Sequence, residues 1–287
     1  MTEKPHPNHP GELGTDRQLA EKLRDRTEIE ARARAIQLLE EAGVQFVVGG
    51  AYAYCQYTGI YRDTKDLDLF LRKRDAGTAL GVLAQHGWRT ERTDEVWLYK
   101  GFHGEYFVDL IFCSGNGVAQ VDDEWFEHAT PGETFGRPVL VAPPEEMIWS
   151  KAFVLERERY DGGDVNHIIR AVGDQLDWNR LLRRFDRHWE VLLSHLMLYR
   201  FVYPTHRTKV PDWVMAELIC RTLDTVRQGD CSESPCRGPL VSRVNYQLDI
   251  REGGCRNGQE REERERRRGG ARFGAGSEFE DSSRSSG

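Results

Sequence analysis

Two aspartates separated by one leucine, Asp66 and Asp68, are the residues whose type and spacing point most directly to chemistry. They stand at the start of the apolar run Asp66–Leu71, which predicts a β-strand. Because side chains alternate between the two faces of a strand, the two carboxylates share one face. Neighbouring carboxylates repel each other unless a cation lies between them, and Mg²⁺ is the usual hard divalent ion bound by such oxygens.

A Gly49-Gly50 pair precedes these acids and follows the apolar run Val44–Val48, which predicts a buried strand. The pair predicts a turn that opens a short helix. The backbone N–H groups and the positive end of such a helix are suited to a phosphate. A metal and a phosphate held on one small scaffold indicate nucleotide chemistry.

A third acid, Asp109, lies in the middle of the aromatic and β-branched run Glu105–Phe112. With Val96–Lys100 this run predicts a hairpin whose turn is Gly101–Gly104. A single charge in an apolar strand needs a reason. Either Asp109 faces water at a sheet edge, or it is a third ligand beside Asp66 and Asp68, and we favour the second interpretation.

The elements that position these residues form two unlike parts. Helical periodicity covers residues 16–42 and 74–86, and residues 139–142 predict a last short strand. After Pro143-Pro144 the chain reads helical, over residues 145–159, 165–172, 178–185, 188–202 and 214–226. We therefore predict an α+β fold, with a small mixed sheet and flanking helices followed by a C-terminal helical bundle. The predicted divisions are a disordered terminus (1–14), an α/β domain that carries the acids (15–142), a helical domain (143–252) and a disordered tail (253–287).

Composition narrows the functional classes. The 287 residues carry a net charge of −7, which argues against a broadly basic surface that coats nucleic acid. No run is long and apolar enough for a membrane span, and the N-terminus lacks the apolar core of a secretory signal. The six cysteines are scattered and no secretory signal precedes them, so we expect reduced thiols in a cytoplasmic protein. Because no membrane span is found, we expect no membrane partner. A zinc site at Cys231 and Cys236 is a minor alternative, because their spacing fits no common ligand pattern.

The stretch VVGGAYAYCQYTGIYRDTKDLDLFL resembles the signature of the polymerase-β-type nucleotidyltransferase superfamily: a strand, a Gly-Gly turn, a helix and Asp-x-Asp on a strand. A third Asp on a later strand completes that signature, as Asp109 does. The form of Gly49, Gly50 and Arg62 to Asp68 is similar to the compact bacterial group that includes AbiEii-type toxins. That group also carries a lysine on a following helix, which matches Lys151.

The resemblance implies an enzyme of the EC 2.7.7 type that moves a nucleoside monophosphate from an NTP such as ATP to a hydroxyl. Two Mg²⁺ ions, with Mn²⁺ as a substitute, would be held by Asp66 and Asp68. Asp109 would hold the ion that activates the attacking hydroxyl. Gly49 and Gly50 would pass N–H groups to the triphosphate.

Basic residues near the acids have two readings each. Arg62 and Lys65 flank the acids, where they would bind the triphosphate or only screen the like charges. Lys151 lies on an apolar helix, where it would contact a phosphate or extend its charged end to water. We predict all three as nucleotide-binding residues.

The resemblance leaves the acceptor open among an RNA 3′ end, a protein and a small molecule, and it allows an antitoxin or regulatory partner. A non-catalytic nucleotide-binding module of the same fold is one alternative function. A glycosyltransferase that uses Asp66 and Asp68 to hold the metal of a sugar nucleotide is another, and it would give Asp109 no role.

Overall fold

A computed structural model describes residues 26–229 and 235–260. Its centre is a seven-stranded mixed sheet in the order β3-β4-β5-β2-β1-β7-β6. Strand β2 runs parallel to β5 and β1 parallel to β7, and the remaining neighbours are antiparallel. The strands are β1 Val47–Val48, β2 Asp66–Phe70, β3 Arg89–Asp94, β4 Leu98–His103, β5 Tyr106–Ile111, β6 Thr130–Thr134 and β7 Arg137–Val141.

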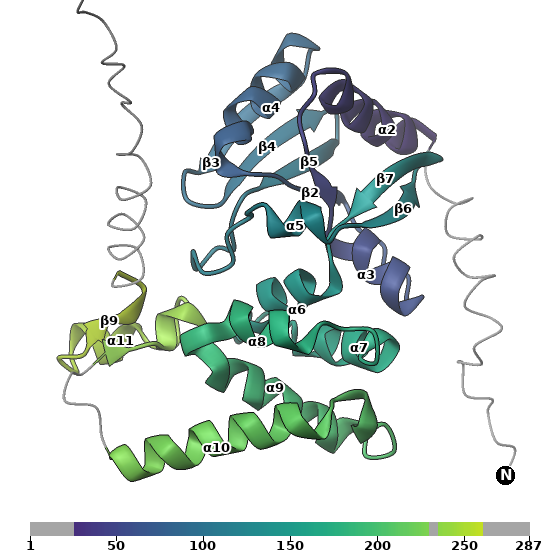
Figure 1. Cartoon of the computed structure of the whole chain (residues 1–287). Coiled ribbons are helices and arrows are strands. Elements are labelled where there is room, and N and C mark those ends of the chain that lie inside the picture. Colours follow the sequence, from purple (N-terminus) through teal and green to yellow (C-terminus); the bar gives the residue numbers. More distant parts are fainter. Residues whose placement is uncertain (1–25, 230–234, 261–287) are drawn as a thin grey trace, which may run out of the picture.

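Two helices cover one face of the sheet, α2 (Arg26–Glu41) and α4 (Lys73–Gln85) (Figure 1). Both are amphipathic, and each buries an apolar stripe that includes Ile36 and Leu39 in α2 and Leu80 and Leu83 in α4. Helix α3 (Gly50–Thr58) follows β1 on the other side, next to α7. The short helix α5 (Glu124–Glu127) precedes β6.

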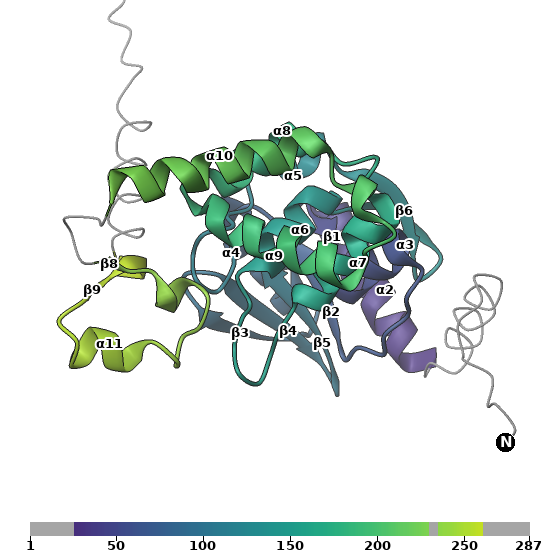
Figure 2. The ribbon, with the colours of Figure 1, turned by 90° about the horizontal axis from the view of Figure 1, so that it is seen from below.

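The second part of the chain is helical, as predicted, and lies below the sheet in Figure 1. Figure 2 shows the same helices from below, across the opposite side of the sheet from α2 and α4. They are α6 Pro144–Ala152, α7 Gly162–Val172, α8 Trp178–Phe185, α9 Trp189–Val202 and α10 Asp212–Gln228. The predicted fold class, a mixed sheet with flanking helices followed by a helical part, is therefore confirmed.

A short irregular region follows α10. It contains β8 (Pro235–Cys236), α11 (Gln247–Arg251) and β9 (Arg256–Asn257), and β8 pairs with β9. Residues 253–260 of the predicted disordered tail belong to this region, whereas residues 1–14 and 261–287 lie outside the described residues. The described cysteines form no disulfide with one another, and Cys231 lies outside the described residues.

The predicted hairpin has a different turn. Strand β4 continues through Gly101 to His103, and the connection is Gly104-Glu105, with Gly104 at φ 61°. Gly101 belongs to the strand because helix α4 packs closely on it: a Cβ at this position would lie 2.7 Å from a methyl carbon of Leu83. The turn therefore falls at the later glycine, where the backbone needs the left-handed conformation.

Two strands were not predicted, and one predicted helix is shorter than expected. Strand β3 (sequence RTERTD) is polar and mostly exposed at the sheet edge, so it lacks the alternation that marks a strand, and β6 was also missed. The helix expected over residues 145–159 ends at Ala152, and Leu155 pairs with Tyr160 in an isolated β-bridge instead.

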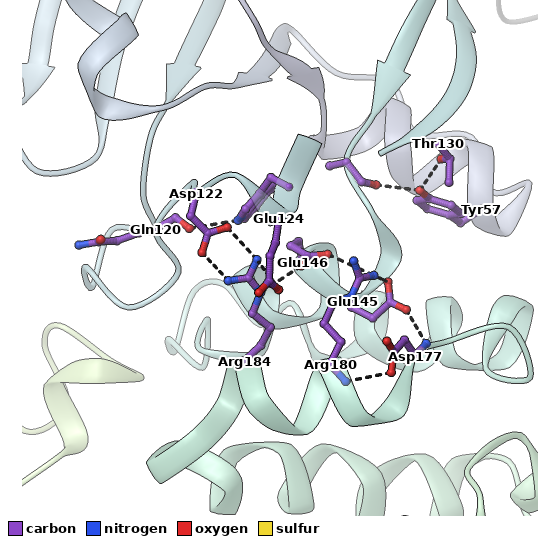
Figure 3. Close-up of polar contacts among 12 residues, drawn as sticks. Tyr57, Gln120, Asp122, Glu124, Thr130, Glu145, Glu146, Asp177, Arg180 and Arg184 are labelled. Atoms are coloured by element: carbon purple, nitrogen blue, oxygen red, sulfur yellow. Dashed lines mark hydrogen bonds and ion pairs between the residues drawn. The ribbon is translucent and has the colours of Figure 1, made fainter. Parts of the chain in front are cut away.

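A network of charged side chains joins the sheet part to the helical part (Figure 3). Arg184 of α8 contacts Asp122 before α5, at 2.5 Å, and Glu146 of α6, at 3.0 Å. Arg180 of α8 pairs with the neighbouring buried acid Glu145. These contacts fix α6, and therefore Lys151 at its end, relative to the sheet. Among the described residues, no helix is long and apolar enough to cross a membrane.

Candidate active site

Three aspartates meet on one face of the sheet. Strands β2 and β5 pair in parallel with Asp68 directly opposite Asp109, and Asp66 lies two residues before Asp68 on the same face. One carboxylate oxygen from each acid lies within 4.8 Å of the others. Asp109 is buried on an inner strand between β4 and β2, so the interpretation of Asp109 as a water-facing residue of a sheet edge is wrong.

Crowding of the three acids changes their protonation. Burial, and then the charges of Asp66 and Asp109, raise the pKa of Asp68 to about 7. Burial also raises the pKa of Asp109, although its ion pair with Lys100 acts in the opposite direction. Asp66 accepts a hydrogen bond from the hydroxyl of Thr64. Hard oxygen donors that repel each other at this distance fit a divalent ion such as Mg²⁺ or Mn²⁺.

The glycine turn touches the acids directly. Gly49 donates its N–H to the backbone oxygen of Asp68 at 2.9 Å, and Gly50 has φ 53°. A Cβ on Gly50 would lie 1.7 Å from a carboxylate oxygen of Asp68, and one on Gly49 would lie 2.2 Å from the Phe70 ring. Only glycine allows this approach, which places the start of α3 beside the carboxylates.

Lys151 lies on the opposite wall, at the end of α6. Its ammonium nitrogen is 2.8 Å from Asp164 and 3.4 Å from Asp161. Asp161 also pairs with Arg159 at 3.0 Å, and Asp164 with Arg62 at 2.6 Å. Each acid therefore keeps an arginine as well as the lysine, and Lys151 is held in place by a balanced network.

These groups line a cleft of about 450 Å³ between the sheet and α6. Its lining includes Gly50, the three aspartates and Lys151, together with Arg159 and Asp161. Two residues predicted for the nucleotide lie elsewhere. Arg62 forms an ion pair with Asp164, and its guanidinium lies over the Tyr54 ring, 4.4 Å from the ring centre. Lys65 is exposed. Neither residue lines the cleft.

Two features of the site are not predicted from the sequence. Lys100 on β4 lies opposite Asp109 and contacts both of its oxygens, at 2.7 and 3.0 Å. The segment Pro239–Arg243, far along the chain, forms part of the wall. A correct turn position in the hairpin would have revealed Lys100, whereas no periodicity in the sequence indicates the segment.

The fold and the acidic cleft together define a protein of the nucleotidyltransferase type. Residues 12–200 match the model of a family described as uncharacterised nucleotidyltransferases, and the chain belongs to that family. No curated protein matches the chain.

Several solved structures are similar in fold. The antibiotic-resistance factor ANT(2'')-Ia is 16% identical, with a TM-score of 0.44 over 60% of this chain and 98% of that chain. A nucleotidyltransferase-like antigen from Paracoccidioides brasiliensis is 15% identical, with a TM-score of 0.45 over 64% and 94% of the two chains. The lincosamide antibiotic adenylyltransferase LnuA is 16% identical, with a TM-score of 0.37 over 50% and 96%.

Proposed function

We propose that this protein transfers a nucleoside monophosphate from an NTP to an acceptor hydroxyl, as an enzyme of the EC 2.7.7 type. The observation that carries the proposal is the meeting of Asp66, Asp68 and Asp109 within 4.8 Å, beside a glycine turn and at the head of a cleft. A glycosyltransferase that uses only Asp66 and Asp68 would not need Asp109 opposite them, so the position of Asp109 favours nucleotidyl transfer.

The three aspartates would hold two Mg²⁺ ions, or Mn²⁺ in their place. Bound ions of this kind activate the attacking hydroxyl and neutralise the charge on the leaving pyrophosphate. The raised pKa of Asp68 and the shared position of the acids support this role, because a carboxylate cluster of this density is relieved of repulsion by a cation.

The chain's other residues would bind the triphosphate. The N–H groups at the start of α3, next to Gly49 and Gly50, have no side-chain cap and carry the partial positive charge of a helix N-terminus. Lys151 faces the same cleft from α6 with its ammonium fixed by Asp161 and Asp164. A triphosphate between these two walls would be held from both sides. Its α-phosphorus would then lie next to the acids.

Asp109 would face the acceptor. The strand order β5-β2-β1 places Asp109 on the far side of Asp68 from the glycine turn, which follows β1. The triphosphate would thus lie toward β1 and the acceptor hydroxyl toward β5. This arrangement separates the two substrates across the metal-binding acids.

The test is label transfer from α-³²P-labelled NTPs in the presence of Mg²⁺ and a cell lysate, with each of the four nucleotides. We expect a labelled acceptor with the wild-type protein and none with Asp66→Asn/Asp68→Asn. The matched control is Asp63→Asn, an exposed acid in the preceding loop. Absence of transfer by the wild-type protein, or equal transfer by the double variant, would contradict the proposal.

The closer grouping with AbiEii-type proteins, and with it an antitoxin partner, belongs to the same proposal. It rests on the match of Gly49, Gly50, Arg62 and Lys151 to that group's pattern. Expression of the protein should arrest growth, and co-expression of the product of the neighbouring gene should relieve the arrest. If expression of an active protein leaves growth unaffected, the grouping with AbiEii-type toxins and the antitoxin partner are contradicted.

A further inference from the structure

A segment near the end of the described chain, Pro239–Arg243, returns to the active-site cleft and forms part of its wall. It lies beyond α10 and beyond the residues that match the family. The side-chain amide of Asn116 donates to the backbone oxygen of Leu240 at 2.6 Å, and the Leu155 N–H donates to the oxygen of Val241 at 3.0 Å. Leu240 is 3% exposed. The segment is therefore packed against both parts of the molecule.

Glu156 holds the end of the segment. The Ser242 hydroxyl donates to one of its carboxylate oxygens and the Arg243 N–H donates to the other, both at 2.6 Å. These hydrogen bonds, with the Ser242 bond the larger cause, lower the pKa of Glu156. Ser242 is 1% exposed, whereas Glu156 is partly exposed. The position of Arg243 is set by this arrangement.

The cleft between the acids and this segment has an apolar floor. Ile111 and Cys113 follow Asp109 along the chain at two-residue spacing and line the same cleft. At about 3.3 Å per extended residue, Cys113 lies about 13 Å beyond Asp109. Five more apolar residues line the cleft, Phe70, Trp97, Met147, Phe153 and Val154, together with the polar residues Ser114, Asn116, Ser150, Glu156 and Ser242.

One cation stands at the edge of this apolar compartment. The Arg243 guanidinium lies 5.8 Å from the centre of the Trp97 ring, and a Cβ on Gly115 would meet one of its nitrogens at 2.1 Å. Arg243 is exposed, and among residues 26–229 and 235–260 its guanidinium forms no close ion pair, although its charge helps to lower the pKa of Glu156, which also lines the cleft. An exposed arginine beside an aromatic face, whose guanidinium is not held in a close ion pair, is suited to an anion attached to a ring or chain.

We propose that the compartment between Asp109 and the Pro239–Arg243 segment is the acceptor subsite. It takes a small molecule with an apolar or aromatic body, whose hydroxyl reaches Asp109 and whose anionic group, a carboxylate or a phosphate, pairs with Arg243. This inference rests on the proposed function. The triphosphate groups, Gly50 and Lys151, are at the acidic end of the cleft, and the apolar floor continues from Asp109, the acid farthest from the glycine turn.

The test measures binding of three matched probes by calorimetry: naphthalene-2-carboxylate, 2-naphthyl phosphate and the neutral naphthalene-2-carboxamide. We expect at least one anionic probe to bind fivefold or more tightly than the amide. Comparison of the two anions identifies the anionic group. In Arg243→Gln the affinity of that anion should fall to the value of the amide, whose own affinity stays unchanged. The control is Arg251→Gln, an exposed arginine on α11 that does not line the cleft.

The same titrations with Mg²⁺ and a saturating non-hydrolysable ATP analogue separate the substrates. Binding of the anionic probe alongside the analogue, with affinity reduced less than twofold, supports an acceptor subsite. Displacement of the probe by the analogue would overturn it, because the compartment would then receive the nucleotide. Equal binding of all three probes, or no effect of Arg243→Gln, would also overturn it. If the ATP analogue does not bind while Arg243-dependent binding of the probe persists, the proposed nucleotidyl transfer is contradicted, whereas the anion-binding subsite is supported.

Discussion

The ammonium of Lys100 lies 2.7 and 3.0 Å from the two carboxylate oxygens of Asp109, directly across the hairpin from it. One acid of the triad is therefore already paired with a cation of the chain itself. Within residues 26–229 and 235–260 no lysine forms an ion pair with Asp66 or Asp68, and these two acids would supply the main charge for a first divalent ion. A second ion that uses Asp109 must share that carboxylate with Lys100 or displace Lys100 from it.

Removal of Lys100 should destabilise the fold, because the buried carboxylate of Asp109 then has no cation beside it. Both side chains are largely shielded from water, so Lys100→Met leaves Asp109 without a counter-charge beside two other carboxylates. We expect the free energy of unfolding to fall by about 3 kcal/mol in urea denaturation at neutral pH. The loss should shrink at lower pH, because Asp109 then takes up a proton.

The double variant Lys100→Met/Asp109→Asn is the control for this loss. It removes the charge as well as its partner and should recover most of the stability. A double variant no more stable than Lys100→Met alone would show that packing of the lysine stem, and not the ion pair, accounts for the effect.

Gly50 and Gly59 form a matched pair for testing the glycine turn. Both have positive φ, 53° and 70°, but a Cβ on Gly59 would meet no atom within 4 Å. Gly59→Ala should therefore cost only the backbone strain, about 1 kcal/mol. Gly50→Ala carries the same strain and also forces the Asp68 carboxylate to move.

We expect Gly50→Ala to abolish detectable Mn²⁺ binding in calorimetry, while Gly59→Ala binds Mn²⁺ like the wild type. Circular dichroism checks that both variants remain folded. Unchanged Mn²⁺ binding by Gly50→Ala would contradict the close approach of the turn to Asp68.

The acids of the site could be predicted because their positions follow from local rules. The two-residue period of a strand places Asp66 and Asp68 together, and an acid inside the apolar run of β5 calls for a partner. The Gly-Gly turn could also be predicted from a local signal, because it lies between an apolar strand and the helix that follows it. These signals survive without any knowledge of how the elements pack.

The remaining parts of the site depend on tertiary contacts. Lys100 faces Asp109 only because Gly101 is a strand residue under α4, which shifts the turn and therefore the register by several residues. Arg62 turns toward Asp164 and Tyr54 because the helical part supplies both an acid and, through His167, a hydrogen bond to the Tyr54 hydroxyl at 2.7 Å. Neither arrangement is encoded in the residues next to Lys100 or Arg62.

Glu146 should make the stability of the protein depend on pH. It is 0% exposed, and burial, which outweighs the neighbouring arginines, raises its pKa to about 7 from 4.5. Between these two values the folded state holds one more proton than the unfolded state. The contribution of Glu146 to the free energy of unfolding is therefore present below about pH 4.5 and is lost as pH rises to about 7.

The comparison with Glu146→Gln isolates this effect from other titrating groups. Urea denaturation of both proteins from pH 4.5 to 8 should show the wild type losing about 3 kcal/mol relative to the variant across that window. A constant difference between the two proteins would mean that Glu146 stays ionised throughout, held by Arg184 and Arg180.

Lys151 and Lys65 provide the sharpest test of which lysine serves the nucleotide. Lys151 lines the cleft, whereas Lys65 is exposed outside its lining. Lys151→Met should weaken the binding of a non-hydrolysable ATP analogue with Mg²⁺ by about tenfold, the loss of one charge-assisted contact to phosphate. Lys65→Met should change it by less than twofold.

The fold should tolerate the loss of Lys151, because Asp164 keeps Arg62 at 2.6 Å and Asp161 keeps Arg159 at 3.0 Å. A melting temperature close to that of the wild type would therefore assign the weaker binding to the lost phosphate contact. Weaker binding by Lys65→Met and not by Lys151→Met would instead place the triphosphate on the outer side of β2, near the loop that carries Arg62.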